Sequence, residues 1–208
     1  MDIDTACVAI AADIATHGHA IRPGFVAREE LAPLREHLMA WWEEGELRRA
    51  GIGRGESWQL REDIRGDYVR WIDFSTPGPF SEFLAGYYEP LRLACNRELL
   101  LGLYEYEGHV TVYPPGRFYR RHVDQFRGAQ HRKLSVILYL NDDWAKDDGG
   151  ELRMYLPDGE GERVLDVLPE AGTLVAFLSH EIPHEVLPAK RERLSLTGWF
   201  RTRDGLLP

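Results

Sequence analysis

The second half of the chain consists of short β-rich runs with no helical pattern between them. Eight such runs follow one another from about residue 104, separated by Gly-, Pro- and Asp-rich turns such as PPG and DDGG. The runs cover residues 109–113, 117–123, 133–141, 150–156, 163–168, 172–178, 184–187 and 193–202. Many short strands in succession are typical of a barrel or a double-sheet jelly roll. We therefore predict a jelly-roll catalytic core over 104–203.

The first hundred residues carry helical patterns instead. Residues 3–16, 27–50 and 80–100 place apolar side chains at spacings of three and four, which is typical of amphipathic helices. Between the last two, residues 58–74 form two short strand-like runs around a polar Arg-Gly-Asp, which predicts a hairpin or a protruding loop. We expect one domain over 1–208, of α+β class, in which the mainly helical part within 1–100 supports the β core.

The composition narrows the class of protein. The sequence is 44% hydrophobic and 28% charged, as in soluble globular proteins, and its net charge of −9 argues against nucleic acid as a partner. The N-terminal segment has aspartates where a secretory signal needs basic residues, and no apolar run reaches the length of a membrane span. The two cysteines, Cys7 and Cys95, lie in unrelated contexts. We expect a cytoplasmic protein that binds neither nucleic acid nor a membrane.

One β-rich run, YRRHVDQF, carries a histidine and an aspartate two residues apart. In a strand, His122 and Asp124 would point to the same face, about 6–7 Å apart along the chain. If they point inward, the pair is costly unless something compensates it. A histidine 60 residues after Asp124, His184, would complete a set of two histidines and one carboxylate, which is typical of non-haem Fe(II) sites. The alternative is an ordinary pair of strand residues plus a turn histidine, and we expect His180 to be such a loop residue.

A second candidate group is a guanidinium nine residues after His184. In RERLSLTGWF, Arg193 alternates with Leu194, so it lies on one defined face of a strand. A guanidinium directed into a barrel needs an anionic partner, which a dicarboxylate can supply with two parallel hydrogen bonds. Pairing with an outer Asp or Glu is the structural alternative, and for Arg193 taken alone we favour that alternative.

Several motifs in a fixed order resemble one known family. They are DIRGDYVRW at 63–71, YPPGRFYRRHVD at 113–124, SVILYLNDDW at 135–144, DGGELRMY at 148–155 and PHEVLPAKRERLSLTGWF at 183–200. Together they resemble the Fe(II)- and 2-oxoglutarate-dependent prolyl 4-hydroxylases, the branch with the hypoxia-inducible-factor prolyl hydroxylases and their bacterial relatives. The resemblance extends from about residue 60 to the C-terminus. It implies a double-stranded β-helix (jelly roll), with Fe(II), 2-oxoglutarate and O2 required and ascorbate as a stimulant.

Matched by position, the resemblance also implies a role for each of eleven residues. The implied iron ligands, which form the catalytic centre, are His122, Asp124 and His184. The implied contacts of 2-oxoglutarate are Arg193, Tyr139, Tyr113 and Trp199. The implied contacts of the substrate, in a finger loop over 58–74 and at the active-site entrance, are Arg65, Asp67, Trp71 and Arg132.

The resemblance implies hydroxylation of a prolyl residue in a protein substrate. Bacterial relatives with a similar C-terminal segment act on the switch loop of elongation factor Tu, so that protein is the expected target by analogy. Two alternatives stay open: the same chemistry on another protein or a free amino acid, and a non-catalytic jelly roll that senses iron or oxygen. A sensor would not need a binding site for 2-oxoglutarate, so Arg193 and Tyr139 argue against it.

Overall fold

Helices lie mainly in the first half of the chain and strands in the second. The computed structural model describes residues 2–53, 59–125 and 131–203. The helical elements are α1 (Ile3–His17), α2 (Arg28–Glu43), α3 (Pro79–Phe83), a π-helical turn (Leu84–Tyr88), α4 (Glu89–Leu99) and a 3-10 turn (Lys146–Asp148). The strands are β1 (His19–Arg22), β2 (Arg48–Arg49), β3 (Tyr68–Trp71), β4 (Glu105–Tyr113), β5 (Tyr119–His122), β6 (Arg132–Tyr139), β7 (Leu152–Asp158), β8 (Gly161–Val167), β9 (Leu174–Leu178), β10 (His184–Val186) and β11 (Arg193–Arg201).

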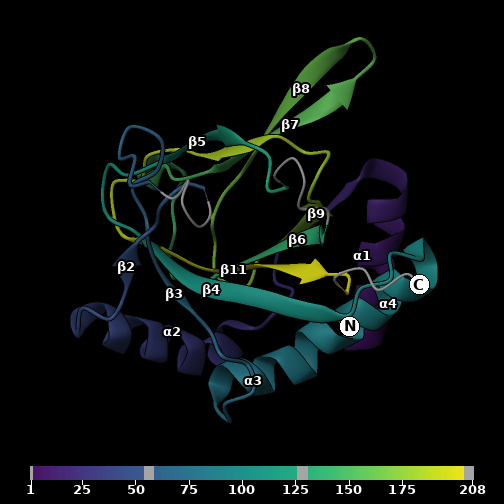
Figure 1. The fold of residues 1–208 in the computed structure, drawn as a ribbon, viewed down its shortest axis with the longest axis horizontal. Coiled ribbons are helices and arrows are strands. Elements are labelled where there is room, and N and C mark those ends of the chain that lie inside the picture. Colours follow the sequence, from purple (N-terminus) through teal and green to yellow (C-terminus); the bar gives the residue numbers. More distant parts are fainter. Residues whose placement is uncertain (1, 54–58, 126–130, 204–208) are drawn as a thin grey trace.

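The strands form two antiparallel sheets. The major sheet has the order β1-β9-β6-β11-β4-β3-β2, and the minor sheet has the order β5-β10-β7-β8. In Figure 1 the minor sheet lies above the major sheet, while the helices lie below and beside the major sheet. The predicted α+β class, with a jelly roll supported by N-terminal helices, is confirmed.

Alternation along the strands divides the interior into two cores. On β6, Leu134, Val136 and Leu138 join the core that the helices form with the major sheet. The intervening Ile137 and Tyr139 join the core between the two sheets. Because successive side chains of a strand point to opposite faces, one sequence pattern supplies both cores. Side chains at the inward-facing positions of the major sheet therefore line any site that lies between the two sheets.

The helix predicted over 27–50 is wrong at its C-terminal end. The helix stops at Glu43, because Gly45 adopts a φ of +72°, a left-handed conformation that ends helices. Arg48 and Arg49 form the short strand β2 instead. Residues 19–22, for which no strand was predicted, pair with β9. The first hundred residues thus supply three strands of the major sheet as well as the helices.

The segment 58–74 contains no hairpin within its described part, and residue 58 lies outside the described residues. Its second half is β3, which pairs with β4 on one side and with β2 on the other. Its first half is held against β5: Arg65 forms a β-bridge with Tyr119, and the Gly66 amide donates to the Phe118 carbonyl at 2.9 Å. The polar turn is therefore positioned beside the minor sheet, at one edge of the space between the sheets.

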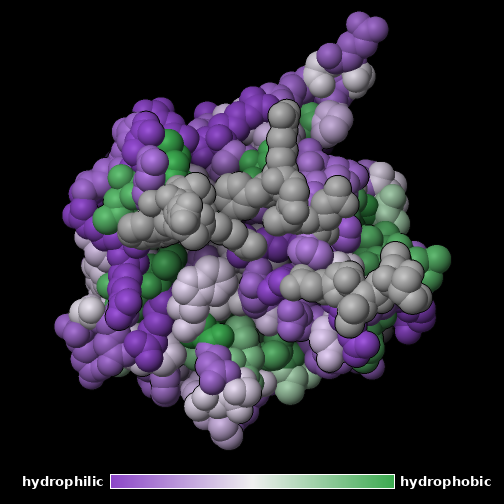
Figure 2. Space-filling view, in the orientation of Figure 1, coloured by the Kyte–Doolittle hydropathy of each residue, from purple (hydrophilic) through white to green (hydrophobic). Residues whose placement is uncertain are grey.

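The β7–β8 hairpin protrudes from the body of the protein (Figure 1). Its outer part carries mainly hydrophilic residues (Figure 2), whereas Leu152 at its base is fully buried. Met154 and Leu156, on the same face of β7, are buried as well, so this face of the hairpin contributes to the core between the sheets while its tip does not. Among the described helices, none is long and apolar enough to cross a membrane.

Candidate active site

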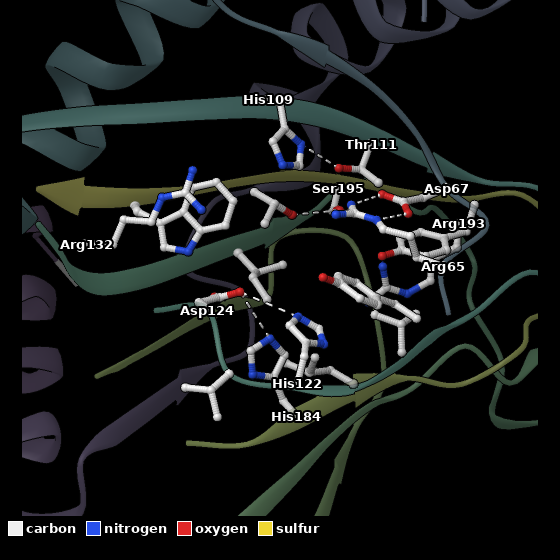
Figure 3. Close-up of a pocket in the computed structure, with 18 residues that line it drawn as sticks. Arg65, Asp67, His109, Thr111, His122, Asp124, Arg132, His184, Arg193 and Ser195 are labelled. Carbon is white, nitrogen blue, oxygen red and sulfur yellow. Dashed lines mark hydrogen bonds and ion pairs between the residues drawn. The ribbon is translucent and has the colours of Figure 1, made fainter. Parts of the chain in front are cut away.

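A cavity of about 90 Å³ lies between the two sheets. Inward-facing residues of the major sheet form one wall: on β4 and β11 these are His109, Thr111, Tyr113, Arg193, Ser195, Thr197 and Trp199. The opposite wall includes His122 and Asp124, at and after the end of β5, and His184 at the start of β10 (Figure 3). Polar side chains from both sheets thus face one enclosed space.

Three potential metal ligands meet on the minor-sheet wall. Nε2 of His122 lies 3.5 Å from Oδ1 of Asp124, and Nε2 of His184 lies 3.7 Å from the same oxygen. The three ligand atoms all lie within 4.8 Å of one another. His184 is paired with His122 across β10 and β5, whereas Asp124 follows the end of β5 in a bend. Strand pairing therefore brings together residues that are far apart in the sequence.

Both histidines are oriented by backbone carbonyl groups. Nδ1 of His122 lies 2.8 Å from the carbonyl oxygen of Arg120, and Nδ1 of His184 lies 3.0 Å from that of Ile182. Because a carbonyl oxygen can only accept, Nδ1 is the donor in each ring and Nε2 keeps its lone pair. Hydrogen bonding at the distant ring nitrogen is the usual arrangement for metal-binding histidines.

The carboxylate of Asp124 is also oriented by a hydrogen bond. The Ser135 hydroxyl donates to Oδ2 of Asp124 at 2.6 Å, which leaves Oδ1 directed at the two imidazoles. Burial raises the pKa of Asp124, but His184, His122 and Ser135 outweigh it and hold that pKa well below its ordinary value. Burial and the neighbouring His122 lower the pKa of His184 to about 4. An ionised carboxylate with two imidazoles is a donor set that fits non-haem Fe(II).

The far end of the cavity is cationic. Arg193 is only 2% exposed, and its Nε donates to the carbonyl oxygen of Gly150 at 2.7 Å. Its Nη2 and the Tyr139 hydroxyl are both buried without a hydrogen-bond partner. The Arg193 guanidinium carbon lies 5.0 Å from the ring centroid of Tyr139 and 5.3 Å from that of Tyr113. No carboxylate pairs with Arg193 within the described residues, so the structural alternative considered for it finds no support there.

Buried donors without partners are costly, which makes this end of the cavity complementary to a bound acceptor. Burial raises the pKa of Tyr139 to about 12, so its hydroxyl keeps the proton that it would donate. A guanidinium and a hydroxyl directed at one point fit a carboxylate group. The residues present therefore fit 2-oxoglutarate at this end and iron at the triad.

Two of the predicted substrate contacts, Arg65 and Asp67, bind each other in the cavity wall. Nε and Nη2 of Arg65 donate to the two oxygens of Asp67 at 2.8 and 2.5 Å. The guanidinium carbon of Arg65 also lies 4.3 Å from the ring centroid of Tyr119. The pair is largely buried, with side-chain exposures of 15% and 0%. In this state the ion pair fixes the segment 65–67 against β5.

The other end of the cavity opens to the surface between aromatic side chains. The guanidinium carbon of Arg132 lies 3.5 Å from the ring centroid of Trp199, and Nε of Arg132 donates to Glu107 at 2.6 Å. Trp71 is 54% exposed, and its ring centroid lies 6.2 Å from that of Trp199. Trp199 follows Arg193 by six residues on β11, about 20 Å in a strand. Arg132 and Arg193 accordingly lie on opposite sides of the cavity in Figure 3.

Sequence analysis missed His109, which lies beside this opening. Its Nδ1 is 2.9 Å from the Thr111 hydroxyl, and its ring contacts those of Trp71 and Trp199 at centroid distances of 4.9 and 5.6 Å. Burial, with Arg65 nearby, lowers the pKa of His109 to about 4. The signal that could have found it is its spacing of two and four residues from Thr111 and Tyr113 on one strand.

Comparison with known proteins agrees with this geometry. Residues 108–201 match the family model of the 2OG-Fe(II) oxygenase superfamily. A crystal structure of a prolyl-4-hydroxylase from Pseudomonas putida is 46% identical, with a TM-score of 0.84, over 95% of this chain and 100% of that one. A prolyl hydroxylase from Trichoplax adhaerens, solved with a hypoxia-inducible-factor peptide fragment, is 26% identical with a TM-score of 0.84, over 95% and 90% of the two chains.

Among curated proteins, human Egl nine homolog 1 is 33% identical over 196 residues, which cover 90% of this chain and 45% of the human protein. The chain spans about half the length of the curated relatives it matches first. The similarity to the Pseudomonas enzyme covers both chains almost completely. The chain therefore belongs to the 2OG-Fe(II) oxygenase superfamily, whose members require Fe(II) and 2-oxoglutarate, and within it resembles the prolyl hydroxylases.

Proposed function

We propose that the protein is a cytoplasmic dioxygenase that hydroxylates a prolyl residue of a protein substrate with Fe(II), 2-oxoglutarate and O2. The observation that carries the proposal is the combination of the triad with the unpaired Arg193 donor in one cavity, next to the unpaired hydroxyl of Tyr139. The triad offers three iron ligands, and Arg193 with Tyr139 offers a carboxylate site. Two solved relatives that match 95% of the chain, at 46% and 26% identity, are named prolyl hydroxylases.

The chain's own residues would bind, orient and shield the reactants. His122, Asp124 and His184 would hold the iron, while Arg193 and the Tyr139 hydroxyl would bind the far carboxylate of 2-oxoglutarate. When bound, Fe(II) and 2-oxoglutarate supply the oxidising chemistry with O2, so no side chain has to act as a general base. The protein would supply fixed geometry in a small cavity between the two sheets, where bound reactants are shielded from bulk water.

A segment of a protein is the substrate that fits the opening of the cavity. The Trichoplax relative was solved with a peptide fragment. At the opening here, Trp71 is exposed, and both Trp71 and Arg132 lie near the ring of Trp199. The peptide would contact four residues: Arg65, Asp67, Trp71 and Arg132. Arg65 and Asp67 could do so either while their ion pair is kept or once it has opened. By analogy with bacterial relatives, the proposed target is the switch loop of elongation factor Tu.

Replacing Ser135 with alanine is expected to weaken Fe(II) binding without removing a ligand. The variant loses the hydrogen bond that holds Oδ2 of Asp124, and outer partners of this kind are worth about 10- to 100-fold in metal affinity. Anaerobic titration with Fe(II) measures the change. Ser195→Ala is a matched control, because Ser195 is equally buried but its hydroxyl bonds to Thr197. Equal affinities in the two variants would contradict the role given to Ser135.

The test of the function is hydroxylation of a defined protein. The purified protein is incubated with Fe(II), 2-oxoglutarate, O2 and elongation factor Tu, and the factor is analysed by peptide mass spectrometry. One added oxygen on a switch-loop proline, absent without 2-oxoglutarate, is the expected result. If 2-oxoglutarate is consumed but the factor is not modified, the protein is still an oxygenase and elongation factor Tu is rejected as its substrate. No consumption under any condition would reject the enzyme and favour the non-catalytic sensor.

A further inference from the structure

A groove of about 1040 Å³ continues from the opening of the active-site cavity across β3 to β2. The residues that line both the groove and the cavity are Arg65, His109, Tyr119, Arg132 and Trp199. A peptide that reaches the triad through this opening therefore has the groove as a continuous surface for its flanking residues. The far end of the groove is formed by β2, the edge strand of the major sheet, which lies beside β3 in Figure 1.

The strand register places Arg48 on the cavity face of the major sheet. Arg48 is paired with Val69, Val69 with Thr111, and Thr111 with Ser195. Directly paired residues of neighbouring strands point to the same face. Since Thr111 and Ser195 line the active-site cavity, Arg48 belongs to the same face, at the free edge of the sheet.

Among the described residues, Arg48 differs from the other groove-lining arginines because no carboxylate pairs with it. Those others each contact a carboxylate: Arg49 with Glu62, Arg65 with Asp67, Arg70 with Glu46, and Arg132 with Glu107. The exposed side chain of Arg48 makes no ion pair or hydrogen bond within the part of the chain that the structure describes. Arg48 is thus a cation without a partner among the described residues, on the face along which a bound peptide would run, in a protein whose net charge is −9.

We propose that Arg48 forms a subsite for an acidic side chain of the peptide substrate, three or four residues from the peptide residue at the cavity opening and therefore further than that from the hydroxylated residue at the triad. This inference rests on the proposed function. From His109 at the opening, Arg48 lies two strands across and two residues along the sheet, about 12 Å in standard sheet geometry. An extended peptide advances about 3.3 Å per residue, so three or four residues cover that distance.

The subsite is tested by binding of synthetic peptides under nitrogen, with Fe(II) and 2-oxoglutarate present. Each fluorescent peptide has a central proline in a neutral background, and a single glutamate is placed at successive positions on either side. Glutamate at one position on one side of the proline, more than three or four residues away, is expected to tighten binding about two- to fivefold at low salt, as exposed ion pairs do. The gain should shrink as salt is added.

Variants assign the effect to the arginine. In Arg48→Gln the preference for glutamate should vanish, and in Arg48→Glu a lysine at the same position should be preferred. Arg163→Gln is the matched control, because Arg163 is an exposed arginine on β8 with no ion pair among the described residues, away from the groove. Equal binding of all peptides to the wild-type protein, no binding at all, or a preference that survives in Arg48→Gln would overturn the proposal.

Admitting oxygen to the same mixtures separates this inference from the function on which it rests. Mass spectrometry then reports whether the bound peptides gain an oxygen on the proline. A position-specific glutamate preference without hydroxylation would reject the prolyl hydroxylase and retain the acidic subsite. Hydroxylation that is equally efficient for all peptides, with equal binding, would retain the enzyme and reject the subsite.

Discussion

Replacing Arg193 with alanine is expected to abolish turnover of 2-oxoglutarate while Fe(II) binding persists. The guanidinium is buried, and Nη2 is a free donor beside the unpaired Tyr139 hydroxyl. Removing one partner of a buried charge pair costs about 2–5 kcal/mol, so kcat/KM for 2-oxoglutarate should fall about 30- to several-thousandfold. Consumption of 2-oxoglutarate and anaerobic Fe(II) titration measure the two quantities on the same preparation.

A loss of folding has to be distinguished from a loss of the carboxylate site. Arg193 also donates to Gly150, so the alanine variant leaves that buried carbonyl without its partner. Arg193→Lys keeps the charge but lacks the planar fork, and an intermediate loss with unchanged Fe(II) affinity would assign the effect to the carboxylate. Arg153→Ala, which removes an exposed ion pair with Asp166, serves as the arginine control. Undiminished turnover in Arg193→Ala would contradict the proposed binding site.

The β core could be predicted from the sequence because each strand is marked by residues within and directly beside it. Each of the eight runs is bounded by turn residues, and each corresponds to a strand of the structure within a few residues. The missed strands are short and depend on distant partners: β1 pairs with β9, and β2 has only two residues. A four-residue run such as residues 19–22 carries no periodic signal until its partner is known. The predicted range of helix α2 is too long because the sequence pattern alone does not show that Gly45 ends the helix.

The three triad residues could be identified from the sequence, because two histidines and an aspartate are typical iron ligands. The polar residues that surround the triad carry no such signal. Ser135 looks like any strand serine, and only the fold shows that its hydroxyl donates to Asp124 at 2.6 Å. His109 and Arg48 are similar cases, since the face that each occupies depends on the register of neighbouring strands. Sequence patterns give the alternation along a strand, whereas the register decides which of the two faces meets the site.

Replacing His184 with alanine is expected to weaken Fe(II) binding by more than the 10- to 100-fold typical of losing an outer hydrogen-bond partner. The change removes the Nε2 atom that lies 3.7 Å from Asp124 and leaves only two of the three clustered ligand atoms. It also leaves space beside Phe177, whose ring centroid is 4.7 Å away, so His184→Gln, which fills more of that space, is measured in parallel. His180→Ala is the control, because that histidine is exposed and contacts Glu181 instead. Iron content and anaerobic titration should show full binding in the control and severe loss in both His184 variants; wild-type affinity in either would remove His184 from the iron site.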